Sequence, residues 1–293
     1  MNTFEHGPGW RGAAALILML AAALSAQGAG AEPVAMATDV QGKAVLAAAG
    51  AKRDLAILTE IDAGTQVELA QGTRLVVVYL RSGEEYTATG PALIRFDDSA
   101  PQSISGAQPQ RRASALEKGK GIRIRPVGVA QAAIVMRSAK PAARIKLLTL
   151  AGSRTLEPSP EFRWQALEGA RGYHFNLADA TGRSVLEFDV AGESYRLPAS
   201  VRLEEGVTYT WDLSTRLPDG RRYASAGDFS IVPAGQREEV EALRPAANAP
   251  LAERIAFAAW LEQQDLHDEA RKYWKAAAAE RPQDARLKQL AGD

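Results

Sequence analysis

The sequence contains no cysteine, which excludes disulfides, thiolate nucleophiles and cysteine-ligated metal sites. It also lacks an excess of either charge, because 35 Lys and Arg residues balance 35 Asp and Glu residues. Bulk attraction to nucleic acid is therefore not indicated. After the first 31 residues the histidines are His174 and His267, which fall in different predicted domains, whereas a zinc site usually needs three or four ligands. We expect no metal and no cofactor.

Motifs that carry catalytic chemistry are also missing. The chain has neither the G-x-S-x-G elbow of α/β-type serine hydrolases nor a G-x-x-x-x-G-K-[ST] phosphate loop. The acidic pairs Glu84-Glu85, Asp97-Asp98 and Glu204-Glu205 are adjacent in sequence. Neighbours in a strand point to opposite faces, so these pairs do not converge on one bond as glycosidase carboxylates must. We expect no catalytic residues and no enzymatic activity.

The N-terminal region decides the expected location. Arg11 precedes an apolar run from Ala13 to Leu24 of about 12 residues, whereas a membrane-spanning helix needs about 20. The small residues Ala29-Gly30-Ala31 follow, as at a signal-peptidase site. This layout predicts a signal peptide over 1–31, cleaved at Ala31 or nearer Ala26, and a periplasmic protein without a stable membrane span after cleavage. The alternative is a signal retained as an anchor.

Residues 162–232 contain short runs in which large apolar side chains alternate with polar ones. Successive side chains of a strand point to opposite faces, so each run lines one face. Turn signals at 179–182, Gly192, 205–206 and 218–220 separate the runs, which is typical of a β-sandwich. The expected core residues are Phe162, Trp164, Tyr173, Phe175, Leu177, Leu186, Phe188, Val190, Val207, Tyr209, Trp211, Leu213, Phe229 and Ile231.

The spacing of this region adds a family likeness. Trp164 and Tyr173 lie on successive expected strands, and Leu203 precedes Tyr209 by six residues. Residues 145–233 thereby resemble fibronectin type III and related Ig-like modules. The resemblance implies that the Tyr209 phenol bonds back to nearby backbone. We interpret the aromatic residues as core, each contributing ~2 kcal/mol by burial; the alternative is a sugar-binding platform formed by Trp164 or Trp211.

Strand signals also dominate residues 32–97. The β-branched run Thr73–Leu80 predicts a strong strand, and Ser82-Gly83 turns it into a return strand at Glu85–Thr89. Gly90-Pro91 ends that strand, and Ala92–Phe96 forms another. Upstream, the residues before Gly64 lead into a further expected strand at 66–69.

This region resembles a divergent FecR-type periplasmic domain in the order of its segments. These are Ile61-Asp62-Ala63-Gly64, then 75–78, Ser82-Gly83 and Gly90-Pro91-Ala92. It departs from that pattern where Ala63 separates Asp62 from Gly64 and where Ser82-Gly83 replaces an aspartate-glycine hairpin. The resemblance implies a small non-catalytic β domain used in envelope protein contacts. FecR regulators carry a cytoplasmic helical segment and a membrane span before this domain. We expect neither feature here, so we do not extend direct transmembrane signalling to this chain.

Residues 98–144 are expected to form a basic linker or an extension of the first β domain, with a linker or long loop over 98–117. From 111 to 146, Glu117 is the sole acid among many bases. A solvated face is one interpretation; the other is a contact surface for an anionic partner, such as an acidic protein, a lipid head group or a cell-wall polymer. The candidate residues of this surface are Arg111, Arg112, Lys118, Lys120, Arg123 and Arg125.

Residues 236–293 predict helices at about 236–244, 251–263 and 267–280, and a short one from Asp284. Ala270, Trp274, Ala277 and Pro282, with Phe257, Ala258 and Leu261 upstream, resemble one tetratricopeptide-type repeat. One such repeat cannot bury its apolar face alone. We therefore expect these helices to pack on the sandwich, to be capped by the first helix, or to dock onto another chain.

The predicted fold class is mainly β, a small β domain plus a fibronectin type III-like sandwich, with an all-α C-terminal segment. The predicted function is a non-enzymatic periplasmic interaction protein of FecR-domain type that presents these modules to an envelope protein or an anionic envelope component. The alternatives are a carbohydrate-binding or cell-wall protein of the envelope, and an accessory subunit of an envelope complex. Burial of Trp164, Tyr173, Tyr209 and Trp211 would remove the carbohydrate option, and an exposed stripe along Leu251, Ile255, Ala258 and Leu261 would favour the accessory subunit.

Overall fold

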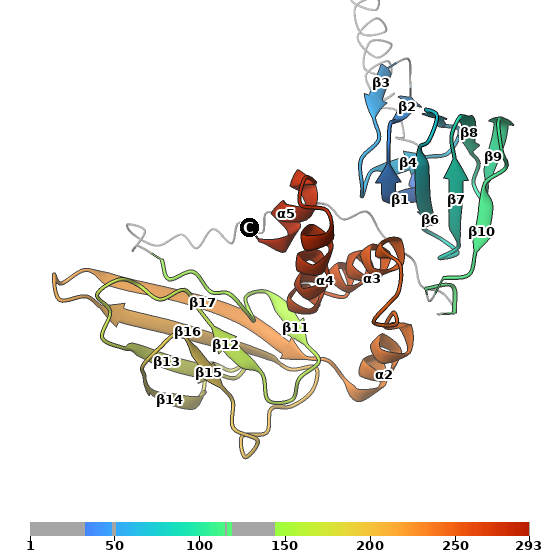
Figure 1. Ribbon diagram of the computed structural model, residues 1–293. Helices are drawn as coiled ribbons and strands as arrows, with labels where there is room; N and C mark the ends of the chain where they lie inside the picture. Colours follow the sequence, from blue (N-terminus) through green and yellow to red (C-terminus); the bar gives the residue numbers. More distant parts are fainter. Residues whose placement is uncertain (1–32, 49–50, 115, 119–143, 293) are drawn as a thin grey trace, which may run out of the picture. The chain divides into compact units, whose positions relative to one another are not determined.

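The computed structural model describes residues 33–48, 51–114, 116–118 and 144–292 (Figure 1). These residues form strands β1–β17 followed by helices α2–α5, which confirms the predicted mainly β fold with a helical C-terminal segment. The predicted signal peptide, residues 1–31, lies outside the described residues. Among the residues that are described, no helix is long and apolar enough to span a membrane.

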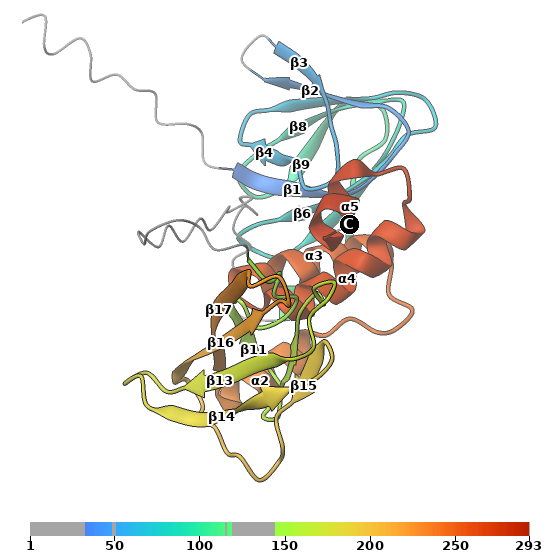
Figure 2. The same cartoon turned by 90° about the vertical axis from the view of Figure 1, so that its left-hand side faces the viewer.

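The first β unit consists of two five-stranded sheets that enclose one apolar core (Figure 2). Sheet A has the order β10-β7-β6-β1-β4, and sheet B has the order β3-β2-β5-β8-β9. Both contribute to the core, sheet A through residues such as Tyr79 and sheet B through residues such as Phe96. The strands are β1 (Pro33–Gln41), β2 (Ala44–Ala48), β3 (Ala51–Asp54), β4 (Glu60–Asp62), β5 (Gln66–Leu69), β6 (Arg74–Tyr79), β7 (Glu85–Thr89), β8 (Ala92–Phe96), β9 (Pro101–Ser105) and β10 (Gln110–Arg112).

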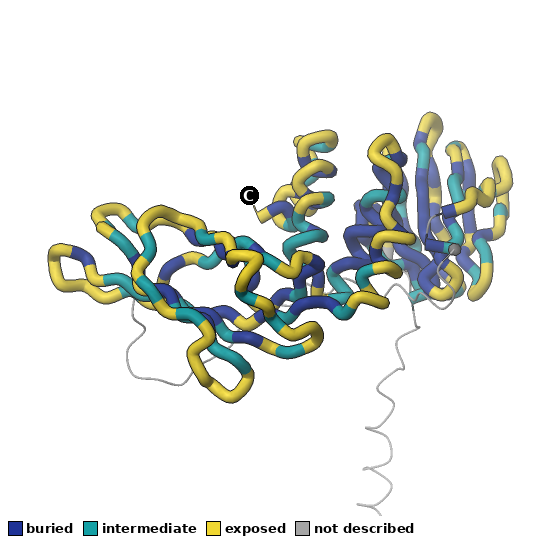
Figure 3. Tube along the Cα trace, turned by 90° about the horizontal axis from the view of Figure 1, so that it is seen from below, coloured by how far each residue is buried: buried dark blue, intermediate teal, exposed yellow. Residues whose placement is uncertain are grey.

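Strand β6 is buried along nearly its whole length, in keeping with its continuous run of apolar residues. Leu75, Val77 and Tyr79 face the core between the two sheets. Val78, on the opposite face, belongs to a cluster shared with the C-terminal helices. A strand covered on both faces needs apolar residues at successive positions rather than at alternate ones. Long buried stretches in this unit are visible in Figure 3.

The prediction of a linker or long loop over 98–117 is wrong for two parts of that segment. Strand β9 pairs with β8, and strand β10 pairs with β7, so residues 101–105 and 110–112 extend sheets B and A. Both strands lie at sheet edges, where exposed polar side chains are normal, and their composition therefore resembles that of a loop. A register shift between Leu93 and Ile94 leaves Ile104 outside the pairing, with 51% of its surface exposed. Such a bulge disrupts an edge that would otherwise pair with another chain.

The second β unit is a sandwich whose larger sheet has the order β11-β17-β16-β13-β14. The smaller sheet pairs β12 with β15, and a bridge joins Leu147 to Trp164 beside it. This two-layer arrangement is that of an Ig-like or fibronectin type III-like domain, as predicted. The strands are β11 (Ser153–Thr155), β12 (Glu161–Arg163), β13 (Tyr173–Ala178), β14 (Ser184–Val190), β15 (Ser194–Arg196), β16 (Thr208–Arg216) and β17 (Arg222–Ile231).

Tyr209 forms the predicted corner. Its hydroxyl oxygen accepts a hydrogen bond from the backbone N–H of Glu204 at 2.9 Å, and Leu203 packs against the core of the sandwich. The bond ties the segment before β16 to the strand itself and satisfies a backbone donor close to the core.

We expect Tyr209→Phe to lower the free energy of unfolding by about 1 kcal/mol, because it leaves the Glu204 N–H without its partner. Urea unfolding followed by tryptophan fluorescence measures the change. Tyr223→Phe is the matched control, since the Tyr223 hydroxyl accepts a hydrogen bond from the exposed Arg221 side chain rather than from the backbone. Equal effects of the two substitutions would contradict the structural role of the corner.

The helices are α2 (Ala234–Leu243), α3 (Leu251–Gln263), α4 (His267–Glu280) and α5 (Ala285–Ala291), close to the predicted ranges. Pro250 is the N-cap residue of α3. Asp284 caps α5 by accepting hydrogen bonds from the backbone N–H groups of Arg286 and Leu287. Helices α3 and α4 pack on each other, as do α4 and α5.

The apolar faces of the helices are covered by the same chain. Leu251, Ile255, Ala258 and Leu261 are all buried, so the exposed stripe that would favour an accessory subunit does not occur. The cluster that contains these residues also includes residues from the first β unit and from the sandwich. The contributing side chains are Met36, Ile57, Leu58, Val78, Leu80, Leu116, Leu156 and Val232.

Polar contacts at Leu150 also connect the sandwich to the helices. The Leu150 N–H donates to Oδ2 of Asp268 at 2.7 Å, and its carbonyl accepts from Nε1 of Trp211 at 2.7 Å. The φ angle of Leu150 is 55°, a left-handed conformation uncommon for a residue with a side chain. Its two backbone bonds hold it in this conformation.

Candidate functional site

The predicted anionic-partner surface does not form one patch on strand β10. Arg111 and Arg112 are neighbours on this strand, so they project to opposite faces of sheet A. Nε of Arg111 lies 2.8 Å from Oε1 of Glu84, and the same guanidinium also pairs with Glu117. Nη1 of Arg112 lies 3.7 Å from Oε1 of Glu85. Each described guanidinium of the predicted surface is thus already paired with carboxylates of its own chain.

The other members of that surface stay a prediction. Lys118 lies in a short 3₁₀ helix, Leu116–Lys118, but its side chain is outside the described part of the molecule. Lys120, Arg123 and Arg125 also lie outside the described residues.

A charged cluster lies where the outer face of sheet A meets the helices. The Asp39 side chain is 3% exposed, and its two oxygens face different cations. Oδ2 lies 3.4 Å from Nη1 of Arg74 on β6, and Oδ1 lies 3.3 Å from Nη2 of Arg281, which follows α4. Nε2 of Gln41 also donates to Oδ2 at 2.7 Å. These contacts link β1, β6 and the end of α4 through one carboxylate.

Glu85, on the same face, is the most unusual member of this cluster. It is 3% exposed, and its Oε1 has no hydrogen-bond partner among the described residues. Burial, assisted by nearby Glu253 and Asp39, raises the pKa of Glu85, while Arg112 and Arg74 oppose the rise. The sequence placed Glu84 and Glu85 on opposite faces, as found, but nothing in the local pattern indicated that one of them would be buried.

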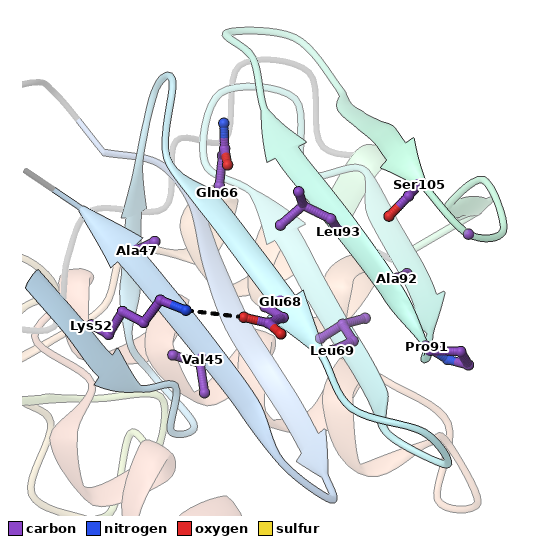
Figure 4. A pocket seen from close by; sticks show the side chains of 11 residues that line it. Val45, Ala47, Lys52, Gln66, Glu68, Leu69, Pro91, Ala92, Leu93 and Ser105 are labelled. Atoms are coloured by element: carbon purple, nitrogen blue, oxygen red, sulfur yellow. Dashed lines mark hydrogen bonds and ion pairs between the residues drawn. The ribbon is translucent and has the colours of Figure 1, made fainter. Parts of the chain in front are cut away.

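The outer face of sheet B carries a hollow of about 750 Å³, which sequence reasoning missed (Figure 4). Val45, Gln66 and Leu93 come from three neighbouring strands and point to this face, whereas Val67 lies in the core. Nζ of Lys52 pairs with Oε2 of Glu68 at 3.3 Å across the hollow. Alternation along β5 could have placed Gln66 and Glu68 outside, but the hollow is lined by residues of five strands that only the pairing brings together.

The lining of the hollow has mixed polarity. It combines apolar side chains with an exposed ion pair, an amide and the Ser105 hydroxyl, and its described residues include no histidine or aromatic ring. The Lys52–Glu68 pair is exposed and contributes little stability. The acid and the base among its described residues, Glu68 and Lys52, are both exposed.

The aromatic platform considered for Trp164 or Trp211 does not form. Trp164, Tyr173, Tyr209 and Trp211 are all buried, which removes these rings as stacking surfaces for a sugar.

His174 lies exposed on the larger sheet, as predicted. Its Nδ1 is 3.0 Å from Oδ1 of Asp189, and its Nε2 is 3.0 Å from Oε1 of Glu187. The hydrogen bond to Asp189 is the main cause that raises the pKa of His174, and the Glu187 carboxylate adds to it. The carboxylates approach opposite nitrogens of the ring and so do not converge on one point. Within the described residues, no group of three or more His, Asp or Glu side chains is arranged to hold a metal ion.

No family model matches the chain, and no curated protein matches it. Among solved structures, CopC from Methylosinus trichosporium OB3b is 18% identical, covering 31% of this chain and 95% of that one, with a TM-score of 0.23. A two-domain fibronectin type III segment of chicken tenascin is 9% identical over 68% of this chain and 94% of that one, with a TM-score of 0.22. The FN1–FN3 domains of chicken CNTN1 are 12% identical over 70% and 69% of the two chains, with a TM-score of 0.23. At these scores the likenesses add nothing to what the strand order establishes.

Proposed function

We propose that this chain is a non-enzymatic interaction protein of the periplasm, of FecR-domain type, which presents its β modules to an envelope partner. The observation that carries the proposal is the hollow on the outer face of sheet B. The equivalent face of sheet A packs in part against the chain's own helices, whereas none of the described helices packs on this concave face of mixed polarity. Such a face is a surface available to another molecule.

Several features support the interpretation of the first β unit as a FecR-type domain. Ile61 is fully buried, and Gly64 and Gly83 have φ angles of 79° and 71° at the two turns that the resemblance rests on. A residue with a side chain would be strained at these angles. Gly90-Pro91 separates β7 from β8 at the expected position.

The tetratricopeptide-type reading rests on helices α3 and α4. Ala270, Trp274 and Ala277 are buried on α4, and Phe257 and Leu261 are buried on α3. Small residues allow two helices to approach, and large ones fill the space between them. In our proposal this helical pair holds the two β units and leaves partner binding to the sheets.

The test is site-specific crosslinking in cells that produce the full chain. A photoreactive amino acid at exposed Gln66, inside the hollow, should form crosslinks to an envelope component. The matched control carries it at Ala226, an exposed residue on the larger sheet of the sandwich. Gln66→Arg with Ser105→Arg should reduce capture of the same component by at least about tenfold, since two bulky charges would fill the hollow. Equal crosslinking from both positions, or capture unchanged by the double substitution, would refute the assignment of the hollow.

A further inference from the structure

Glu85 lies at the boundary between the covered and the open part of sheet A's outer face. In the strand register it is opposite Val78 on β6 and opposite Arg112 on β10. Val78 belongs to the apolar cluster shared with α3 and α4, whereas Arg112 is an exposed edge residue. The carboxylate is therefore held in the rim of the contact between sheet A and the helices.

Each element around Glu85 brings a charged group toward it. Arg112 comes from β10, Arg74 from β6, Asp39 from β1 and Glu253 from α3. The two cations do not neutralise it well, because Arg112 stays 3.7 Å away and Arg74 is engaged with Asp39. In an ionised carboxylate at this position, Oε1 loses water without gaining a hydrogen bond from the described residues.

We propose that Glu85 makes the contact between sheet A and helix α3 pH-sensitive, so that the contact is tight when the carboxyl is protonated and loosens when it ionises. Protonation removes the buried charge and its repulsion from Glu253 and Asp39. Arg112 then loses its partner at little cost, because its side chain is 44% exposed.

The direction follows from proton linkage. The folded chain holds the Glu85 proton more tightly than the unfolded chain does, so the folded contact gains stability as the pH falls. The gain is complete below the ordinary pKa of 4.5 and is lost as the pH rises through the raised value. Opening of the contact would uncover Met36 and Val78 of sheet A and Leu80, which follows β6.

Hydrogen exchange of the full chain between pH 5 and pH 8, corrected for intrinsic exchange rates, tests this proposal. The opening constant of α3 and β6 amides should rise with pH, by up to about tenfold per pH unit while Glu85 titrates. Glu85→Gln keeps the size of the side chain and removes its charge. It should lower the opening constant at pH 7 and remove the part of its pH dependence that Glu85 causes. His267, bonded to Glu262, titrates in the same helices, so the wild-type and variant slopes are compared by difference.

Glu84→Gln is the matched control, because Glu84 is the neighbour on the opposite face and pairs with Arg111. It should keep the wild-type slope. A Glu85→Gln slope equal to that of the wild type would overturn the proposal, and so would the same Glu85-dependent slope in β13 and β16 of the sandwich. Carbon-13 NMR of the Glu85 carboxyl in the unmodified protein gives an independent measure that needs no variant. A pKa at or below 4.5 in the folded chain would also overturn it.

Discussion

Trp211→Ala should lower the free energy of unfolding by about 3–5 kcal/mol, because it opens a large cavity in the sandwich core. Trp211 has 0% of its surface exposed. The centroid of its ring lies 5.1 Å from the ring centroid of Phe162 and 5.9 Å from that of Phe175. The substitution also removes the hydrogen bond from Nε1 to the carbonyl of Leu150. That carbonyl lies at the contact with α4, so the loss should weaken the attachment of the helices as well.

Urea unfolding followed by circular dichroism measures this effect through the midpoint. The control is Ile104→Ala, since Ile104 is a large but exposed apolar residue in the first β unit. It should change the unfolding free energy by less than about 0.5 kcal/mol. A loss below about 1 kcal/mol for Trp211→Ala would mean that the core of the sandwich is not packed as described.

The second large effect is expected at Gly90, between β7 and β8. A Cβ atom at this position would lie 1.9 Å from the carbonyl oxygen of Ala70 and 2.9 Å from its carbonyl carbon. Both neighbours are backbone, so a rotamer change cannot relieve the clash. The Gly90 N–H also donates to the carbonyl of Thr73 at 2.8 Å, which holds the strand end against that segment. Gly90→Ala should therefore cost about 3 kcal/mol or more, at the upper end of overpacking effects.

Gly235→Ala is the control for a glycine without such a constraint. Gly235 lies in the first turn of α2, and nothing lies within 4 Å of a Cβ placed there. Alanine is the better helix former by up to about 1 kcal/mol, so this substitution should be neutral or stabilising. Thermal unfolding of both variants separates the cases. A Gly90→Ala chain as stable as the unmodified one would show that the approach of the Ala70 carbonyl is wrong.

Features that depend on neighbours in sequence were predictable. Strands β7 and β8 have the predicted bounds, 85–89 and 92–96, because the breaks at Ser82-Gly83 and Gly90-Pro91 are local. Helices α3 and α4 also have the predicted bounds, since Pro250 begins one and Pro282 follows the other. The inward aromatic residues of the sandwich, such as Trp164 and Trp211, followed from strict alternation alone.

Features that depend on pairing across the chain were not predictable. Residues 101–112 were predicted to form a loop because they are largely polar. Polar side chains suit an edge strand equally well, and only the pairing with β8 and β7 distinguishes a strand from a loop. The sequence indicated that Arg111 and Arg112 belong to one basic surface. In the structure they project to opposite faces of β10, and each forms an ion pair with a carboxylate.

The sequence by itself determined strands such as β7 and β8, the helices and the innermost aromatic residues of the sandwich, because period and turn residues are local signals. Leu186, Phe188, Val190 and Val207, also expected in that core, are only half-buried. Only the tertiary structure decided that Glu85 is buried and that sheet B carries an open hollow. Glu85 has the sequence surroundings of a surface residue, and one of its charged neighbours, Glu253, comes from α3, more than 160 residues later in the chain. The hollow is lined by residues from five paired strands, and no single segment encodes that pairing.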